Sequence, residues 1–462
     1  MENKKHIGSI DGLVQAMDRF FKNLTPPRVL VIGFAIVILL GALILTLPVA
    51  TVDGQGLKFL NALFTATSAV CVTGLIVVDT GTTFTLFGQL VILSLIQIGG
   101  LGFMTFATFF AIILGRKVTL KERLLLQEAL NQVSLEGVVR LAKYVLQVTF
   151  AIEAAGALIL AVRWSFDMSW TKAIYYGIFH AVSSFNNAGF DLFGEYSSIT
   201  RYVGDPIVNI TIMLLIIFGG LGFTVLSDLY MHKGKKMMLH TKMVLSMTGI
   251  LIFAGAILIF LIEFSNPKTL GSLDPMAKIL SSLFQSVTAR TAGYNTLDMT
   301  GLRSTTLLIM IILMFIGASP GSTGGGIKTT TFASVSLYVF SLFRGESFVT
   351  FKERSIATDV IQKAVAVVIM ALVLVLVVTG VLTLTEKADF LTLLFETTSA
   401  FATVGLTVGL TPTLTNMGKL MIIFTMFAGR VGPLTLVFAL SHKRNGPQQK
   451  HIKYPEEKIM IG

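Results

Sequence analysis

The chain has 462 residues, of which 53% are hydrophobic and only 13% are charged, with a formal net charge of +11. Soluble domains carry roughly 25% charged residues, so this composition excludes an ordinary soluble protein and indicates an integral membrane protein. The positive charge is then a signal of membrane topology, and nucleic-acid binding is not expected. The one cysteine, Cys71, excludes an intramolecular disulfide framework.

In chain order, a basic segment (1–28) lacks an apolar core before Pro26, so no cleaved signal peptide is expected. The next stretch, 29–49, has about the 20 residues needed to cross ~30 Å of hydrocarbon. It is followed by a shorter apolar segment (59–75) and a second long apolar stretch (87–114).

This succession occurs three more times along the chain. The first, uniformly apolar stretches lie at 144–162, 243–262 and 364–384, and the second stretches lie at 207–231, 305–343 and 417–440. The short segments between them lie at 173–190, 276–294 and 390–406. We therefore predict eight crossings.

Basic residues indicate which loops stay on the cytoplasmic side. They concentrate in 1–28, 115–143, 232–242, 344–363 and 442–462. These segments alternate correctly for eight crossings with both termini cytoplasmic, and the last forms a cytoplasmic tail.

Each short segment reads as a helix of about a dozen residues, a few extended residues and a glycine. The glycines Gly74, Gly189, Gly293 and Gly405 lie 115, 104 and 112 residues apart. A bulky apolar side chain stands ten positions before each one: Phe64, Phe179, Leu283 and Phe395. The near-constant period predicts four repeats, at 29–114, 144–231, 242–343 and 361–441.

The short segments cannot cross a membrane, and irregular backbone at membrane depth must be buried or line a watery cavity. Four such segments predict an all-α integral membrane protein: four parallel helix/pore-loop/helix repeats around a pseudo-fourfold axis, with eight transmembrane and four re-entrant pore helices. For one segment alone, an interfacial helix with a glycine cap is the better interpretation. Four in register favour a pore.

In such a pore, extended backbone can turn its carbonyls to the axis and replace the hydration shell of a monovalent cation. We predict K+ at the backbone carbonyls of a filter formed by Val70, Cys71, Val72, Thr73, Gly74, Phe185, Asn186, Asn187, Ala188, Gly189, Ala289, Arg290, Thr291, Ala292, Gly293, Phe401, Ala402, Thr403, Val404 and Gly405.

The segments ending in CVTGL, NNAGF, RTAGY and TVGLT, with the glycine pairs of QIGGLGF and FGGLGF, resemble the Trk/Ktr/HKT superfamily of potassium transporters. The pattern is most similar to the membrane-spanning subunit of bacterial Ktr uptake systems and covers nearly the whole chain. The family's selectivity glycines map onto Gly74, Gly189, Gly293 and Gly405. Because a serine in the first loop accompanies sodium transport in that family, Gly74 argues for potassium.

The resemblance implies a homodimer in the plasma membrane of a bacterium, with a cytosolic octameric ring of nucleotide-binding regulatory domains as partner. It also implies Na+ as an activator. The chain itself has no recognisable nucleotide site, so control by ATP or ADP would come from that partner.

The second stretch of the third repeat contains GASPGSTGGGIKTTT, which interrupts an apolar run. A continuous helix over 305–343 would be about 60 Å long, twice what a bilayer needs. Pro320 and the glycines predict a break. A P-loop is excluded because Ile327 intervenes between Gly326 and Lys328 and no strand precedes it.

By resemblance this break is the family's intramembrane gating loop, 317–328, placed below the filter. The alternative is a kinked helix with a packing loop. Lys328 and Arg430 are cations within membrane spans; each forms either an electrostatic barrier or a cap on helix-end carbonyls. The predicted gate consists of Gly317, Ala318, Ser319, Pro320, Gly321, Ser322, Thr323, Gly324, Gly325, Gly326, Lys328 and Arg430.

Arg290 is expected to point away from the axis, with Glu396 as a candidate partner. His180 is expected to be a packed core residue, and Asn186 and Asn187 to cap local backbone or to orient filter carbonyls. No catalytic dyad or metal-ligand cluster is found, so an enzyme is not expected. The alternatives are a secondary cation transporter with alternating access and a sodium-permeable variant of the same pore.

Overall fold

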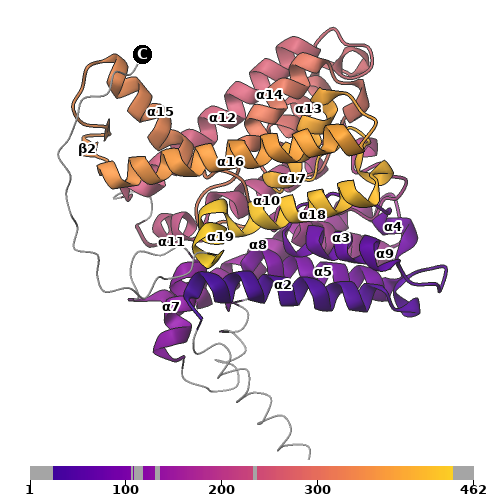
Figure 1. The fold of residues 1–462 in the computed structure, drawn as a ribbon. Helices are drawn as coiled ribbons and strands as arrows, with labels where there is room; N and C mark the ends of the chain where they lie inside the picture. The colour runs from indigo at the N-terminus through magenta and orange to yellow at the C-terminus, as the bar shows by residue number, and fades with distance from the viewer. Residues whose placement is uncertain are drawn as a thin grey trace, which may run out of the picture.

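The computed structural model describes residues 24–102, 104–105, 108, 118–130, 136–232 and 237–440, and the chain there is mainly helical (Figure 1). The predicted tail and most of the predicted N-terminal segment lie outside the described residues. So do parts of the loops at 103–117 and 232–242. A short antiparallel ribbon joins β1 (Thr350–Phe351) to β2 (Arg354–Ser355).

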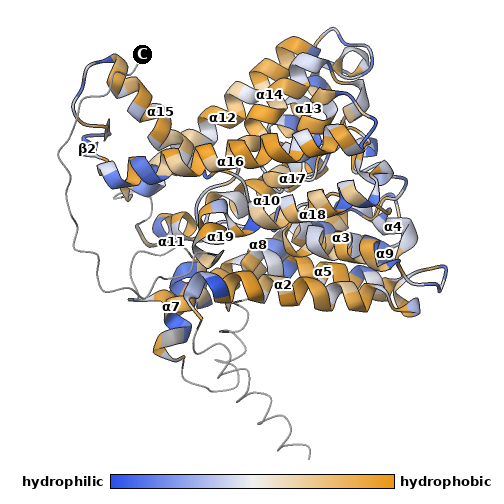
Figure 2. Cartoon of the chain, viewed as in Figure 1, coloured by the Kyte–Doolittle hydropathy of each residue, from blue (hydrophilic) through white to orange (hydrophobic). Residues whose placement is uncertain are grey.

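Among the described residues, four helices are each long and apolar enough to cross a membrane. They are α2 (Pro26–Leu45), α8 (Val138–Trp164), α12 (Leu239–Glu263) and α16 (Thr358–Thr385). Much of their outer surface is hydrophobic, as the orange lengths of α2, α12 and α16 show in Figure 2. Exposed apolar side chains such as Leu43, Phe253 and Val377 fit a lipid environment. A helix also satisfies its own backbone hydrogen bonds, as the hydrocarbon core of a membrane requires.

A shorter helix follows each long one: α3 (Phe59–Val70), α9 (Trp170–Phe185), α13 (Pro275–Thr288) and α17 (Phe390–Phe401). We call these four the pore helices. The second helices of the repeats are α5 (Leu86–Leu101), α10 (Pro206–Leu221), α14 (Ser304–Phe315) and α18 (Asn416–Val431). The remaining helices are α4 (Thr80–Thr83), α7 (Leu120–Ala129), α11 (Phe223–His232), α15 (Thr329–Phe343) and α19 (Pro433–Leu440).

The packing of the helices is cyclic. Each pore helix packs against the long helix before it, and each second helix packs against the pore helix of the next repeat. Thus α5 contacts α9, α10 contacts α13, α14 contacts α17, and α18 contacts α3. The fourth repeat is thereby joined to the first, and the pore helices lie inside the ring of contacts.

Three second stretches are broken where the sequence predicted continuous spans. The breaks fall at Gly102, Gly222 and Gly432, with φ of 81°, 93° and 91°. A residue with such a φ cannot continue a right-handed helix, and only glycine adopts it without a Cβ penalty. At Gly222 the bend between α10 and α11 is 95°. The predicted spans 87–114, 207–231 and 417–440 were therefore wrong as continuous helices.

The third repeat also differs in register from the expectation. The fully buried aromatic of α13 is Phe284, whereas Leu283, ten positions before Gly293, is only partly buried. The third repeat therefore has one residue fewer than the others between its buried aromatic side chain and the glycine, although an apolar residue also stands ten positions before the glycine there.

Candidate selectivity filter and gate

The four predicted filter glycines meet in one closed ring. A Cβ added to Gly189 would lie 2.6 Å from the carbonyl oxygen of Ala292, and one added to Gly293 would lie 2.6 Å from that of Val404. At the other two positions the added Cβ would be closer still, to the carbonyl oxygen of Ala188 for Gly74 and of Thr73 for Gly405. Each glycine thus abuts the residue before the next glycine, and glycine is required because no side chain fits.

All four segments share an unusual backbone conformation. The residue two positions before each glycine also has a positive φ: Val72 (57°), Asn187 (59°), Thr291 (71°) and Thr403 (50°). Non-glycine residues in this region cost of order 1–3 kcal/mol, and such strain collects at functional sites. Four repetitions at the same place indicate that this backbone geometry serves a function.

The pore helices hold the backbone N–H groups of the filter. The amides of Thr73, Ala188 and Val404 donate to carbonyls in α3, α9 and α17 at 2.7, 2.7 and 2.8 Å. In the first and fourth segments a serine hydroxyl also accepts from the glycine N–H, at 3.0 Å for Gly74 and 3.1 Å for Gly405. With their N–H groups engaged on the helix side, the segments present carbonyl oxygens to the ring.

The predicted filter residues divide into three groups by position. Val70, Phe185 and Phe401 end their pore helices, and their carbonyls face glycines of the second helices rather than the ring. Cys71, Asn186, Ala289 and Ala402 are the residues directly after the helices, and in the third segment Arg290 follows Ala289 before the ring. The residues from the positive-φ position to the glycine form the ring itself: Val72–Gly74, Asn187–Gly189, Thr291–Gly293 and Thr403–Gly405.

The predicted gating loop lies directly against the inner side of this ring. The Gly325 N–H donates to the Thr403 hydroxyl at 3.0 Å, and the Asn187 amide lies 3.2 Å from the Thr323 hydroxyl. A Cβ at Gly324 would collide with the Thr291 hydroxyl. Side chains from three of the four positive-φ positions therefore touch the loop.

The loop is also fixed at its base and flanks. Its ends are joined by a bridge between Ile316 and Ile327, and Lys328 Nζ donates to the Gly324 carbonyl at 2.7 Å. The N–H groups of Ser319 and Thr323 donate to carbonyls of α10, at 3.0 and 3.2 Å. The Gly321 carbonyl accepts from the Phe223 N–H at 2.9 Å.

Arg430 connects the loop to two other parts of the chain. From the end of α18, its guanidinium donates to the carbonyl of Thr323 and to those of Gly99 and Gly100 in α5. A cavity of about 320 Å³ has Lys328, Arg430 and Gly326 in its walls. Both predicted cations thus line this cavity, and both also bind carbonyls.

The expected pairing of Arg290 with Glu396 is wrong. Arg290 donates to the Gly317 carbonyl at 3.3 Å and lines a small cavity between α10 and α12. The Glu396 carboxylate accepts from the hydroxyls of Thr407, at 2.8 Å, and Thr411. The sequence could not reveal this, because residues adjacent in the repeat pattern need not have side chains that face each other.

His180 is fully buried, as expected, with Nδ1 2.8 Å from the Tyr176 carbonyl. Asn186 does more than cap its own helix, since its Nδ2 lies 2.7 Å from Gln97 Oε1 and 3.0 Å from a carboxyl oxygen of Glu153. Sequence analysis missed Glu153. The available signal was a lone acid inside an otherwise apolar span.

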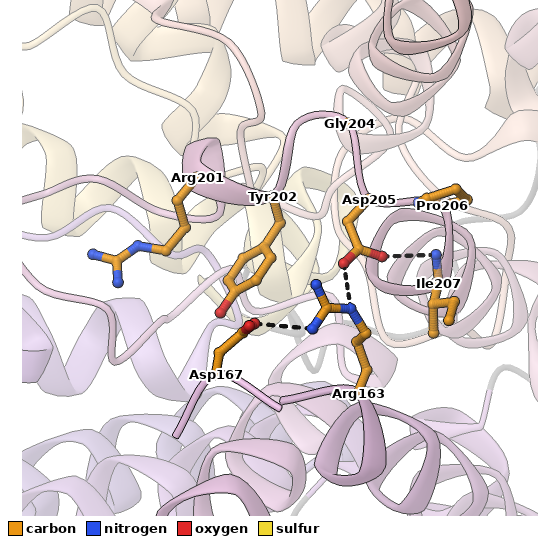
Figure 3. Close-up of a pocket in the computed structure, with 8 residues that line it drawn as sticks. All are labelled: Arg163, Asp167, Arg201, Tyr202, Gly204, Asp205, Pro206 and Ile207. Atoms are coloured by element: carbon orange, nitrogen blue, oxygen red, sulfur yellow. Dashed lines mark hydrogen bonds and ion pairs between the residues drawn. The ribbon is translucent and has the colours of Figure 1, made fainter. Parts of the chain in front are cut away.

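A separate surface pocket lies at the ends of α8 and α10 (Figure 3). Arg163 bridges Asp205 at 2.6 Å and Asp167 at 3.0 Å there, and Asp205 also caps the first turn of α10. None of the residues that line this pocket belongs to the predicted filter or gating loop, and its ion pairs hold the two helix ends together.

Known proteins resemble this chain over nearly its whole length. A family model for TrkH, described as a cation transport protein, matches residues 28–453. The chain is 48% identical to the Ktr system potassium uptake protein B of Bacillus subtilis, over 95% of this chain and 97% of that protein. It is 43% identical to the protein of the same name from Vibrio alginolyticus, over 94% of this chain and 95% of that protein.

A third relative, the potassium/sodium uptake protein NtpJ of Enterococcus hirae, is 42% identical over 96% of this chain and 99% of that protein. Among solved structures, the potassium transporter TrkH from Vibrio parahaemolyticus matches with a TM-score of 0.70 and 18% identity. The match covers 89% of this chain and 83% of that one, and it shows a shared fold.

Proposed function

The chain belongs to the TrkH family of cation transport proteins, and from this we propose that it is the K+-translocating membrane subunit of a regulated bacterial uptake system. It is an integral membrane protein, and its family is one of transporters rather than enzymes. The observation that carries the proposal is the closed ring of Gly74, Gly189, Gly293 and Gly405.

Permeation then follows from the backbone of the ring. A K+ ion loses its water shell and is coordinated by carbonyl oxygens, such as those of Thr73, Ala188, Ala292 and Val404. The four pore helices direct their partly negative C-terminal ends at the same region, which favours a cation. In this proposal eight crossings and four re-entrant helices surround a pseudo-fourfold axis, in the plasma membrane, with both termini cytoplasmic.

The gating loop is proposed to close the pore below the ring. Its contacts with Thr403, Asn187 and Arg430 support a position across the ion path. Opening would require these hydrogen bonds to break. A regulatory partner would then control the pore by breaking or restoring them. Following the resemblance, that partner is a cytosolic octameric ring that binds ATP or ADP, the membrane subunit is a homodimer, and Na+ acts as an activator.

A sodium-permeable variant of the same pore is the second candidate. It is favoured by the relative named a potassium/sodium uptake protein. Glycine at all four ring positions argues against it, because the absence of a side chain leaves the carbonyl ring intact.

The test replaces Gly405 with Ser in a bacterial strain that needs external K+. A Cβ at 405 would collide with the Thr73 carbonyl, so we expect G405S to reduce K+ uptake at least about tenfold, equivalent to ~1.4 kcal/mol, or to admit Na+. Uptake of K+ and Na+ is measured at equal membrane levels of protein. Wild-type K+ and Na+ fluxes in G405S would refute the pore, and equal K+ and Na+ uptake by the wild type would favour the second candidate.

A further inference from the structure

A buried glutamate stands behind the second filter segment. Glu153 lies in the middle of α8 with 4% of its surface exposed. An ionisable side chain at this depth is costly and is usually functional. The ion path proposed above does not include it.

The carboxyl oxygens of Glu153 are bound by two amide groups. One accepts from Gln97 Nε2 of α5 at 3.1 Å, and the other accepts from Asn186 Nδ2 at 3.0 Å. Asn186 also donates to Gln97 Oε1 at 2.7 Å. The three side chains form a closed triangle in which Glu153 accepts from both amides and Gln97 also accepts from Asn186. Asn186 Nδ2 lies 2.9 Å from the Val182 carbonyl as well, so its two hydrogens are shared among three acceptors.

This donor order requires an acid at one corner. A carboxylate only accepts hydrogen bonds, whereas an amide carries both a donor and an acceptor end. If residue 153 were Gln, the three amides could close the triangle only with Asn186 turned so that its Oδ1 accepts one of the bonds. Either Asn186 changes its orientation or one hydrogen bond is lost inside the protein.

Asn186 connects this triangle of side chains to the glycine ring. It is the residue directly after α9, and the next residue, Asn187, has the positive φ that begins the ring segment. Its side chain also presses against α5, because a Cβ at Gly100 would collide with Asn186 Oδ1. The corresponding positions after α3 and α17 hold Cys71 and Ala402, which carry no amide.

Packing alone does not fix the triangle. Glu153 and Gln97 line a cavity of about 390 Å³ between α5, α8 and α9, whose rim includes the exposed side chains of Phe150 and Ile178. On that side the two side chains are not packed against other side chains of the protein, and the hydrogen bonds of the triangle hold them where they lie.

We propose that Glu153 is a positioning residue for ion selectivity: its two acceptor oxygens fix Asn186 and so set how closely the Asn187–Gly189 segment approaches the ion. The inference rests on the proposed K+ transport. It gives the second segment a support that the first and fourth segments lack.

The test compares E153Q with the wild type for K+ uptake and for its inhibition by Na+, at equal membrane levels of protein. One lost buried hydrogen bond corresponds to roughly a five- to tenfold change. We expect the K+ over Na+ preference to fall by that factor, with a higher KM for K+ and a smaller change in maximal rate. An unchanged preference in E153Q overturns the inference.

A double variant that exchanges the acid and the amide tests the same inference independently. In the double variant E153Q/Q97E the acid moves to position 97, where both of its oxygens can accept, and all three hydrogen bonds can form in the reverse direction. We expect the preference to return toward the wild-type value. If the double variant transports K+ but remains as unselective as E153Q, the role of the triangle is refuted.

Two controls separate other causes. E263Q removes a buried acid at the end of α12, where Glu263 accepts from Asn266, Thr269, Thr306 and the N–H of Arg303, none of which belongs to a ring segment, and it should leave the ion preference unchanged. If E153Q does not accumulate, N186L removes the double donor while the Gln97–Glu153 bond remains, and a wild-type preference there overturns the inference. Failure of the wild type to take up K+ would instead refute the proposed function.

Discussion

At the scale of single residues, three glycines of the second helices lie so close to backbone carbonyls that no side chain fits there. Gly99, Gly219 and Gly429 lie against the carbonyls of Val70, Phe185 and Phe401, the last residues of three pore helices. A Cβ at any of the three would lie far inside van der Waals contact with backbone. These glycines let the second helices pack against the last turns of three pore helices, just before the segments that lead to the glycine ring.

We therefore expect G219A to destabilise the protein by about 1–3 kcal/mol, as overpacking does, and to reduce K+ uptake. The matched control is G249A, because Gly249 also lies in a membrane helix but has open space around its Cβ position. In G249A the better helix propensity of Ala should leave stability unchanged or raise it by up to ~1 kcal/mol. Thermal unfolding in detergent measures both variants, and equal Tm values would contradict the packing argument.

At the scale of elements, the sequence predicts the four short segments and the break in the third repeat. Their glycines, their period and their apolar length carry those predictions. The breaks at Gly102, Gly222 and Gly432 were missed because each glycine lies inside an apolar stretch of spanning length, where hydropathy gives no sign of a bend. The signal available was a glycine three positions after an earlier one, in GGLG at Gly102 and Gly222 and in GRVG at Gly432.

The site was predictable only where it is made of backbone. Ring glycines can be identified from one sequence, since backbone geometry limits the residue type. The contacts of Arg290 with Gly317 and of Asn186 with Glu153 span 27 and 33 residues, sequence separations that no local pattern records.

The start of the fourth pore helix gives a prediction about pH. Asp389 lies outside the membrane-spanning segments, and its carboxylate accepts from the Thr392 hydroxyl at 2.7 Å and from the Thr392 N–H at 3.1 Å. These bonds lower the pKa of Asp389 below its usual value of 3.8. Because the folded pKa is depressed, the stabilisation is complete well above pH 3.8 and is lost as the pH falls through the folded pKa.

D389A should cost about 0.5–1 kcal/mol at pH 7, the low end for a lost helix cap because the group is exposed. The gap in Tm between wild type and variant should shrink as the pH falls below 3.8. D359A is the control, since Asp359 is also exposed in the first turn of a helix and its nearest ion pair, with Lys363, spans 3.8 Å. A gap that stays constant down to the lowest pH at which the protein folds would rule out the cap.

At the scale of the whole molecule, the predicted gating loop is connected by hydrogen bonds or along the chain to every repeat. It continues from α14 in the third, binds α10 and Asn187 of the second, and binds Thr403 of the fourth. Arg430 then links the loop to the carbonyls of α5 in the first. A rearrangement of any repeat would therefore alter what the loop is bound to.

Deleting residues 318–325 should raise K+ flux sharply, because the proposed obstruction is removed. The two ends left by this deletion are already adjacent, since a Cβ at Gly317 would lie 3.1 Å from Gly326 Cα. R430Q should raise flux less, and R430K should lie between R430Q and the wild type, because Lys keeps the charge but lacks the planar fork of donors.

Flux is measured as K+ uptake at equal membrane levels of protein, and adding G405S to the deletion checks that ions still pass the filter. Unchanged flux in the deletion would remove the gate assignment. Unchanged flux in R430Q would reject a barrier at that position.

Because a single polypeptide supplies all four members of the glycine ring, a codon change alters one quarter of the ion's surroundings and leaves three quarters as they were. In a channel built from four identical copies the same change would appear four times at once. Each segment can therefore keep its own neighbours beside a shared glycine, and the positions three residues before the four glycines hold Cys71, Asn186, Arg290 and Ala402.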